Sequence, residues 1–260
     1  MVPSLAAQRP VVETRNRGRV LLEVTIVLTV TLGMSGWQSV LDLVEAYLQP
    51  EPISAQAAPL VRPLSWQPWI DLARQLAWVV TNLAWGAMAL YLLVITGTRL
   101  ARVGLDRTQP LRDIVRGVVL AAAIGIPGIG VYFAFRAAGL ALEVQPSTLD
   151  AHWWTVPVLL SASLANAFVE ESIVVAYLAT RLRQAGWRWP AVIVAGCLLR
   201  GSYHLYQGWG GFFGNIAMEL ILLAAWLRTR RLAPLIVAHF VMDATVFVGY
   251  AFLAPHVGWL

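Results

Sequence analysis

The most informative part of the sequence is the stretch WWTVPVLLSASLANAFVEESIVVAYLAT, residues 153–180, because it is apolar over the length of a membrane crossing yet carries the adjacent glutamates Glu170 and Glu171. A hydrocarbon core of roughly 30 Å needs about 20 apolar residues in a spanning helix. Ionisable side chains at that depth are costly unless they are paired or hydrated. The stretch therefore predicts a transmembrane helix whose carboxylates have a functional or paired role.

The composition of the whole chain agrees with a protein embedded in lipid. Of its 260 residues, 58% are hydrophobic and only 13% are charged, a balance that a soluble domain could not bury. The fold class expected is all-α, a polytopic transmembrane helical bundle with the lipid bilayer as its surroundings. About seven spans are predicted, near residues 20–40, 73–97, 114–139, 153–180, 190–207, 212–227 and 232–254.

The charges predict an orientation and exclude nucleic acid as a partner. All 19 basic residues are arginines, and they lie between the apolar runs, not on one polar face. Such arginine use suggests a GC-rich bacterium, so we expect a bacterial cytoplasmic membrane protein. Fifteen of the arginines lie on alternate connections, which predicts an N-terminus inside and a C-terminus outside. These connections are the N-terminus, residues 98–116, residues 181–188 and the cluster of Arg228, Arg230 and Arg231.

Polar residues in the last four predicted spans recur at a spacing of four, which places each pair on one helix face. Four such faces are expected to meet in a common interior. A carboxylate one turn from a histidine can also fix the ring's tautomer, a role expected of Asp243 toward His239. The pairs are Asn166 with Glu170, Arg200 with His204, Asn215 with Glu219, and His239 with Asp243.

This set of residue types suits amide hydrolysis, which needs an activated water, a base, donors for the developing oxyanion and an acid for the leaving amine. A buried carboxylate and two histidines can supply these functions directly. They can also bind a divalent metal such as zinc, with Glu170, His204 and His239 as the ligands. The sequence leaves both mechanisms open. No His-Glu-x-x-His helix is present, which excludes a zincin-type site.

The order of these residues resembles the three motifs of the CPBP family of intramembrane endopeptidases, which includes CAAX prenyl proteases and bacteriocin-processing or self-immunity proteins. The motifs are Glu170-Glu171 followed by Tyr177-Leu178, then Tyr203-His204, then His239-x-x-x-Asp243, within residues 153–250. The resemblance implies that Glu170 is the water-activating base and that Glu171 helps to hold the charge of the site. It also implies that His204 positions the water or a metal, and that His239 and Asp243 stabilise the oxyanion.

The resemblance implies an intramembrane endopeptidase that cleaves a membrane-associated protein or peptide, in the prenyl protease branch a lipidated one. It divides the chain into a cytoplasmic tail at 1–19, a transmembrane region of variable type at 20–150, a CPBP-like catalytic core at 151–254 and a short C-terminal tail at 255–260. Two alternatives stay open. One is a non-catalytic self-immunity or scaffold protein, and the other is a proton-coupled transporter, which would normally show inverted repeats in both halves.

Two positions depart from the family pattern. The arginine usually found five residues after the first glutamate is Val175 here, and the phenylalanine usually found four residues before the histidine is Arg200. We hypothesise that Arg200 replaces the missing arginine as the charge partner of one of the glutamates. For Glu219, a structural partnership with an arginine or a histidine is expected more than a catalytic role.

The predicted spans also place His204 at a different depth from Glu170 and His239, although the three need a common level. Helix rise limits how far a side chain can reach along the membrane normal. We therefore expect Gly201 and the turn Gly208–Gly211 to lie inside the protein and not beyond the membrane surface.

Overall fold

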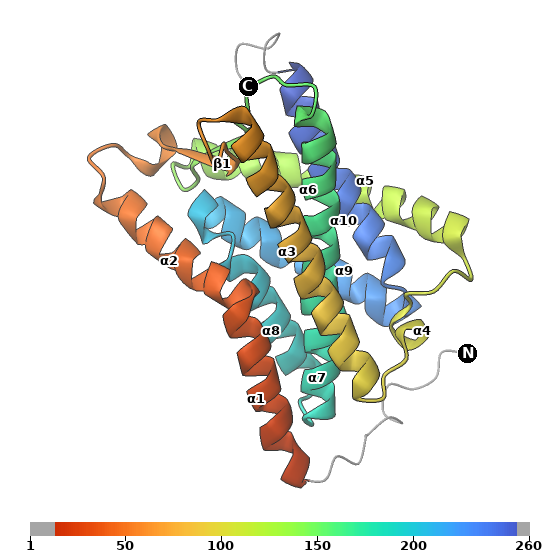
Figure 1. Ribbon diagram of the computed structural model, residues 1–260. Helices are drawn as coiled ribbons and strands as arrows, with labels where there is room; N and C mark the ends of the chain where they lie inside the picture. Colours follow the sequence, from red (N-terminus) through yellow and green to blue (C-terminus); the bar gives the residue numbers. More distant parts are fainter. Residues whose placement is uncertain (1–13, 254–260) are drawn as a thin grey trace.

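The computed structural model describes residues 14–253 and is mostly helical, as expected (Figure 1). The predicted C-terminal tail and most of the N-terminal tail lie outside these residues, and the first helix already begins at Thr14. The helices are α1 (Thr14–Val30), α2 (Leu32–Leu48), α3 (Pro68–Ile95), α4 (Leu100–Val103), α5 (Pro110–Ala137), α6 (Thr155–Glu170), α7 (Ala179–Gln184), α8 (Trp189–Ser202), α9 (Trp209–Thr229) and α10 (Ala233–Leu253).

Five helices of the described part are long and apolar enough to cross a membrane: α3, α5, α9, α10 and the continuous helix Thr155–Gln184, which includes α6 and α7. The first predicted span is instead the pair α1 and α2, bent by 52°. The bend falls at Thr31, whose backbone is not helical and whose hydroxyl donates to the carbonyl of Val27. Counted as one span, this pair brings the total to six.

The fifth predicted span, residues 190–207, is shorter than expected. The only α-helix in this range is α8. Its 14 residues give a helix roughly 21 Å long, which is shorter than the hydrocarbon core of a bilayer. The chain then makes a short 3-10 turn and enters α9 at Gly208, whose φ of 84° is left-handed. A Cβ at Gly208 would lie 2.8 Å from the carbonyl oxygen of Leu140, and Trp209 donates its N–H to that same oxygen. The turn thus packs against protein, in line with the expectation for Gly208–Gly211.

The helix Thr155–Gln184 is the centre of the bundle. Its middle segment, η3 (Glu171–Leu178), is a π-helix in which every residue is buried. Figure 1 shows α6 between α3 and α10, and α5 packs against the far side of α10. Because the glutamates lie where α6 passes into η3, protein and not lipid surrounds them.

Two short strands depart from the expectation of an all-α fold. The strand β1 (Ala57–Val61) pairs in parallel with β2 (Glu143–Ser147), with Ala57 opposite Glu143. The pair joins two connections that are far apart in the sequence, and it lies at the end of the molecule opposite α7 (Figure 1).

Arginine-bearing connections meet at the other end of the molecule. Gln184 donates to Thr98, which links the end of α7 to the end of α3. The N–H of Leu232 donates to Gly104, which links the start of α10 to α4. Figure 1 shows α4, α7 and the start of α1 at this end. The grouping agrees with the alternating arginine pattern, and the side of the membrane that it faces stays a prediction.

Candidate active site

Arg200, in the last turn of α8, is the centre of the site and is fully buried. Its Nη1 donates to Glu170 Oε2 at 3.1 Å and its Nη2 donates to Glu171 Oε1 at 2.7 Å. Its Nε donates to Glu219 Oε2 at 2.6 Å. A guanidinium presents its N–H groups in a rigid planar fork, which suits several carboxylates at once. The hypothesised charge partner thus contacts both glutamates of the pair and a third from α9.

The π-helical segment begins at the second glutamate of the pair. Neighbouring residues on an α-helix point about 100° apart, yet both carboxylates reach the same guanidinium. π-Helical turns are rare and occur often at functional sites. The far end of the segment is fixed by α1, where Glu23 accepts from Tyr177 Oη at 2.9 Å and from Arg181 Nη2 at 2.6 Å. Sequence reasoning missed the π-helix and this anchor.

Tyr203 singles out Glu170 from the other carboxylates. Its hydroxyl donates to Glu170 Oε2 at 2.7 Å, and its own carbonyl accepts from Ser39 on α2 at 3.0 Å. The side chain of Glu170 is 5% exposed, whereas those of Glu171 and Glu219 are completely buried. Glu170 is therefore the member of the trio nearest to open space. The sequence placed Tyr203 in a motif but gave it no role.

His239, on α10, lies between two carboxylates. Its Nδ1 is 2.9 Å from Glu171 Oε1, and its Nε2 is 3.6 Å from Asp243 Oδ2. Asn166 on α6 donates to that same Asp243 oxygen at 2.9 Å. The carboxylate that accepts a hydrogen bond from the imidazole is thus Glu171. Asp243, which was expected to orient His239, makes only a longer charge contact with the ring.

His204 lies at the edge of the network. Its Nδ1 donates to the carbonyl of Arg200 at 2.9 Å, and its ring packs on Tyr203 with 4.7 Å between the ring centroids. With the proton on Nδ1, the neutral ring keeps Nε2 as an acceptor. Within residues 14–253, no hydrogen bond joins His204 to Glu170 or His239.

The expected metal ligands are not arranged to hold a metal. Across the described residues, no three His, Cys, Asp or Glu side chains are placed to hold a metal ion. One oxygen of Glu170 is taken by two donors, and both ring nitrogens of His239 face carboxylates. In this arrangement the donor set of Glu170, His204 and His239, which the sequence left open as ligands of a divalent metal such as zinc, does not fit that metal.

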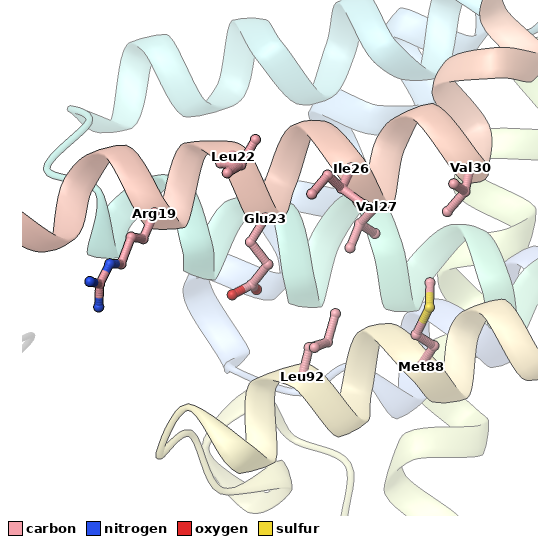
Figure 2. Close-up of a pocket in the computed structure, with 8 residues that line it drawn as sticks. All are labelled: Arg19, Leu22, Glu23, Ile26, Val27, Val30, Met88 and Leu92. Atoms are coloured by element: carbon pink, nitrogen blue, oxygen red, sulfur yellow. The ribbon is translucent and has the colours of Figure 1, made fainter.

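A surface groove of about 370 Å³ lies apart from this network. Figure 2 shows α1 side chains such as Ile26 and Val27 facing Met88 and Leu92 of α3 across the groove. Its lining is almost entirely apolar, with Arg19 and Glu23 toward one end. Arg200, its three carboxylate partners Glu170, Glu171 and Glu219, and the side chains of Tyr203 and His239 bonded to them form what we call the Arg200 network. None of these residues lines the groove.

Membrane-length helices around a buried cluster of carboxylates, imidazoles and one guanidinium define an integral membrane protein. Residues 152–245 match the family model described as type II CAAX prenyl endopeptidase Rce1-like. The match runs from the start of α6 into α10 and confirms the resemblance to the CPBP family for this part of the chain. It supports a function of the CAAX-type intramembrane protease kind, with a protein or peptide substrate. No curated protein and no solved structure matched.

Proposed function

We propose that the protein is an intramembrane endopeptidase that hydrolyses a peptide bond in a membrane-associated protein or peptide. The observation that carries the proposal is the position of Glu170 in the Arg200 network. Arg200 and Tyr203 both donate to its Oε2, and it alone among the three carboxylates on Arg200 has an exposed edge.

In this mechanism Glu170 is the general base. Two donors hold Oε2, whereas Oε1 receives no hydrogen bond from any described residue, so Oε1 is the oxygen that accepts a proton from water. The water oxygen then bonds to the carbonyl carbon of the substrate. The same proton passes from Glu170 to the amine nitrogen as the C–N bond breaks, so that the nitrogen leaves as a neutral amine. A positioned base of this kind accelerates proton transfer by roughly 10²–10⁴-fold.

The histidines take the remaining roles. His204 has a free acceptor at Nε2 and orients the attacking water. His239, held by Glu171, donates to the oxygen of the tetrahedral intermediate, and Asp243 balances the charge of its ring from 3.6 Å. Preorganised donors aimed at a developing oxyanion are often the largest single contribution to such catalysis.

A second candidate is a non-catalytic scaffold or self-immunity protein of the same fold. The observation that favours it is the complete burial of Arg200 and Glu171, together with Val175 at the usual arginine position. A sealed ion-pair network can serve to fix a fold without any reaction.

The test uses full-length protein in lipid nanodiscs and fluorogenic peptides with and without a C-terminal isoprenyl group. Glu170→Gln is expected to reduce cleavage by roughly 10²–10⁴-fold, while the unfolding temperature stays close to that of the parent protein. The control is Glu45→Gln, at an exposed glutamate of α2, which leaves cleavage unchanged. Equal cleavage by the parent protein and Glu170→Gln would remove Glu170 as the base. No cleavage of any peptide by the parent protein would favour the scaffold.

A further inference from the structure

Two arginines share one tryptophan at the end of the molecule where α7 and α9 finish. The guanidinium carbon of Arg183 lies 4.9 Å from the ring centroid of Trp189, and that of Arg230 lies 5.4 Å from the same centroid. Arg230 is also 4.9 Å from the ring of Trp226. Arginine stacks well on indole faces, so the ring of Trp189 contacts two positively charged side chains.

Neither of these arginines has a carboxylate partner among the described residues. The side chain of Arg183 donates to the carbonyl of Trp187. Two arginines nearby in the sequence do have carboxylate partners. Arg181 pairs with Glu23, and Arg231 pairs with Asp106 and Asp113. The charges of Arg183 and Arg230 are therefore left without a counter-ion beside this tryptophan, although Arg181 and Arg231 are paired with carboxylates.

The backbone conformation of Arg230 and the positive charge of Arg183 near it are both unfavourable for Arg230. Arg230 is the only non-glycine residue of the described chain with a positive φ, at 55°, a conformation that its Cβ disfavours. Burial lowers the pKa of Arg230 from its ordinary value, and the nearby charge of Arg183 lowers it further. A bound anion would relieve this repulsion.

Helix dipoles provide a simpler explanation for part of the arrangement. Arg183 lies in the last turn of α7 and Arg230 caps α9, and the carbonyl end of a helix favours a cation. That effect accounts for one cation at each helix end. The left-handed backbone of Arg230 is likewise a common way for an α-helix to end. Neither effect requires both guanidinium groups to lie over the ring of Trp189.

We propose that Arg183, Arg230 and Trp189 form a binding site for a phosphate group, and that the phosphate belongs to the headgroup of an anionic membrane phospholipid. Guanidinium groups match phosphate oxygens in pairs. Tryptophans gather at the level of lipid headgroups, and arginines near a membrane surface attract anionic lipids. The site lies at the same end as the other arginine-bearing connections, and it is separate from the Arg200 network.

The test measures the unfolding temperature of the full-length protein in nanodiscs of phosphatidylcholine, with and without phosphatidylglycerol. Phosphatidylglycerol is expected to raise it by roughly 2–4 °C, the shift that a modest binding free energy gives in a protein of this size. Arg183→Gln and Arg230→Gly should each lose most of this rise. In phosphatidylcholine alone, Arg230→Gly should be at least as stable as the parent protein, because glycine relieves the backbone at that position.

The matched control is Arg102→Gln, which removes one exposed arginine at the same end and should keep the lipid-dependent rise. An equal loss in Arg102→Gln, or a full rise in the Arg183→Gln and Arg230→Gly double variant, would overturn the site. A third arm adds inorganic phosphate at matched ionic strength without phosphatidylglycerol. If phosphate alone gives the whole shift and the lipid adds nothing, the assignment to a headgroup is wrong.

Discussion

Arg200 Nε lies 2.6 Å from Glu219 Oε2, a contact that joins α8 to α9. Glu219 is completely buried, and its other carboxylate oxygen has no hydrogen-bond partner among the described residues. Because Glu219 holds the Nε edge of the guanidinium, the two Nη groups are directed at Glu170 and Glu171. Glu219 is thus a positioning residue that acts through Arg200.

Replacing Glu219 separates its geometric role from its charge. In Glu219→Gln the side-chain oxygen can still accept from Arg200, and one of three carboxylates around a single guanidinium is removed, so we expect a stability change within about 1 kcal/mol. In Glu219→Leu the buried Nε loses its acceptor, which costs about 1–3 kcal/mol. Denaturant titration measures both. Equal losses in the two variants would contradict the positioning role.

Removing Arg200 leaves its carboxylates buried without their cation. Arg200→Leu is expected to destabilise the protein by about 3–5 kcal/mol and to abolish peptide cleavage. Because the resemblance to the CPBP family implies an arginine at the position of Val175, Arg200→Leu combined with Val175→Arg should recover part of both properties. The readouts are the unfolding temperature and the cleavage rate, with Val175→Arg alone as the control. A double variant no better than Arg200→Leu would refute the charge swap.

The Tyr203 hydroxyl predicts a selective effect on catalysis. Tyr203→Phe removes one of the two donors to Glu170 Oε2 but keeps the aromatic ring. A hydrogen bond to a charged group contributes about 1.5–3 kcal/mol, so the loss should lower kcat by roughly 10–100-fold with little change in KM. The control is Tyr206→Phe, which removes a hydroxyl that accepts a hydrogen bond from Gln207 and is not hydrogen-bonded to Glu170. This variant should leave kcat unchanged. A rise in KM with unchanged kcat would instead assign Tyr203 to substrate binding.

A close approach of α3 to the centre of the bundle predicts a packing effect near the glutamates. A Cβ at Gly86 would lie 2.7 Å from the ring of Phe168 and 3.2 Å from the Cα of Val169. Gly86→Ala should therefore cost about 1–3 kcal/mol through overpacking and reduce cleavage as well. The matched variant Gly128→Ala, where nothing lies within 4 Å, should be neutral or stabilising by up to about 1 kcal/mol. A reversed order of the two stabilities would disprove the contact.

Asp106, outside the spans, predicts a pH dependence at acid pH. Hydrogen bonds from Thr108 and then from Arg231 lower its pKa from 3.8 to about 2. A carboxylate with a lowered pKa contributes stability that is complete above 3.8 and is lost as the pH falls through about 2. The unfolding temperature of Asp106→Asn should lie below that of the parent protein at neutral pH and approach it in this window. A difference between the two unfolding temperatures that stays constant through this window would contradict the prediction.

Much of the fold could be predicted because long apolar runs report membrane helices directly. The helix α3 at Pro68–Ile95 and the helix α9 at Trp209–Thr229 overlap the expected spans 73–97 and 212–227. The break at Thr31 and the early end of α8 depend on local hydrogen bonds and on packing against the segment after α5. Hydropathy averages over such details. The pairing of β1 with β2 joins residues more than eighty positions apart, which no local pattern encodes.

The site was predictable where the sequence had an anomaly. Arg200 departs from the family pattern, which predicted it as the charge partner of a glutamate, and its contacts with Glu170 and Glu171 agree with that hypothesis. The roles of Tyr203 and Glu23 were missed, because a tyrosine in a motif and a glutamate near an arginine-rich terminus have common structural explanations. The π-helix at Glu171 also leaves no distinct mark in composition.

The contact of Glu23 with Tyr177 and Arg181 means that the C-terminal part of the chain depends on α1 for its folding. The family match starts at residue 152, so a fragment trimmed to that match would carry Arg181 without the acid that neutralises it. It would also lack Ser39, which holds the carbonyl of Tyr203. We expect such a fragment to misfold in the bilayer. It should fold correctly when α1 and α2 are supplied as a separate polypeptide.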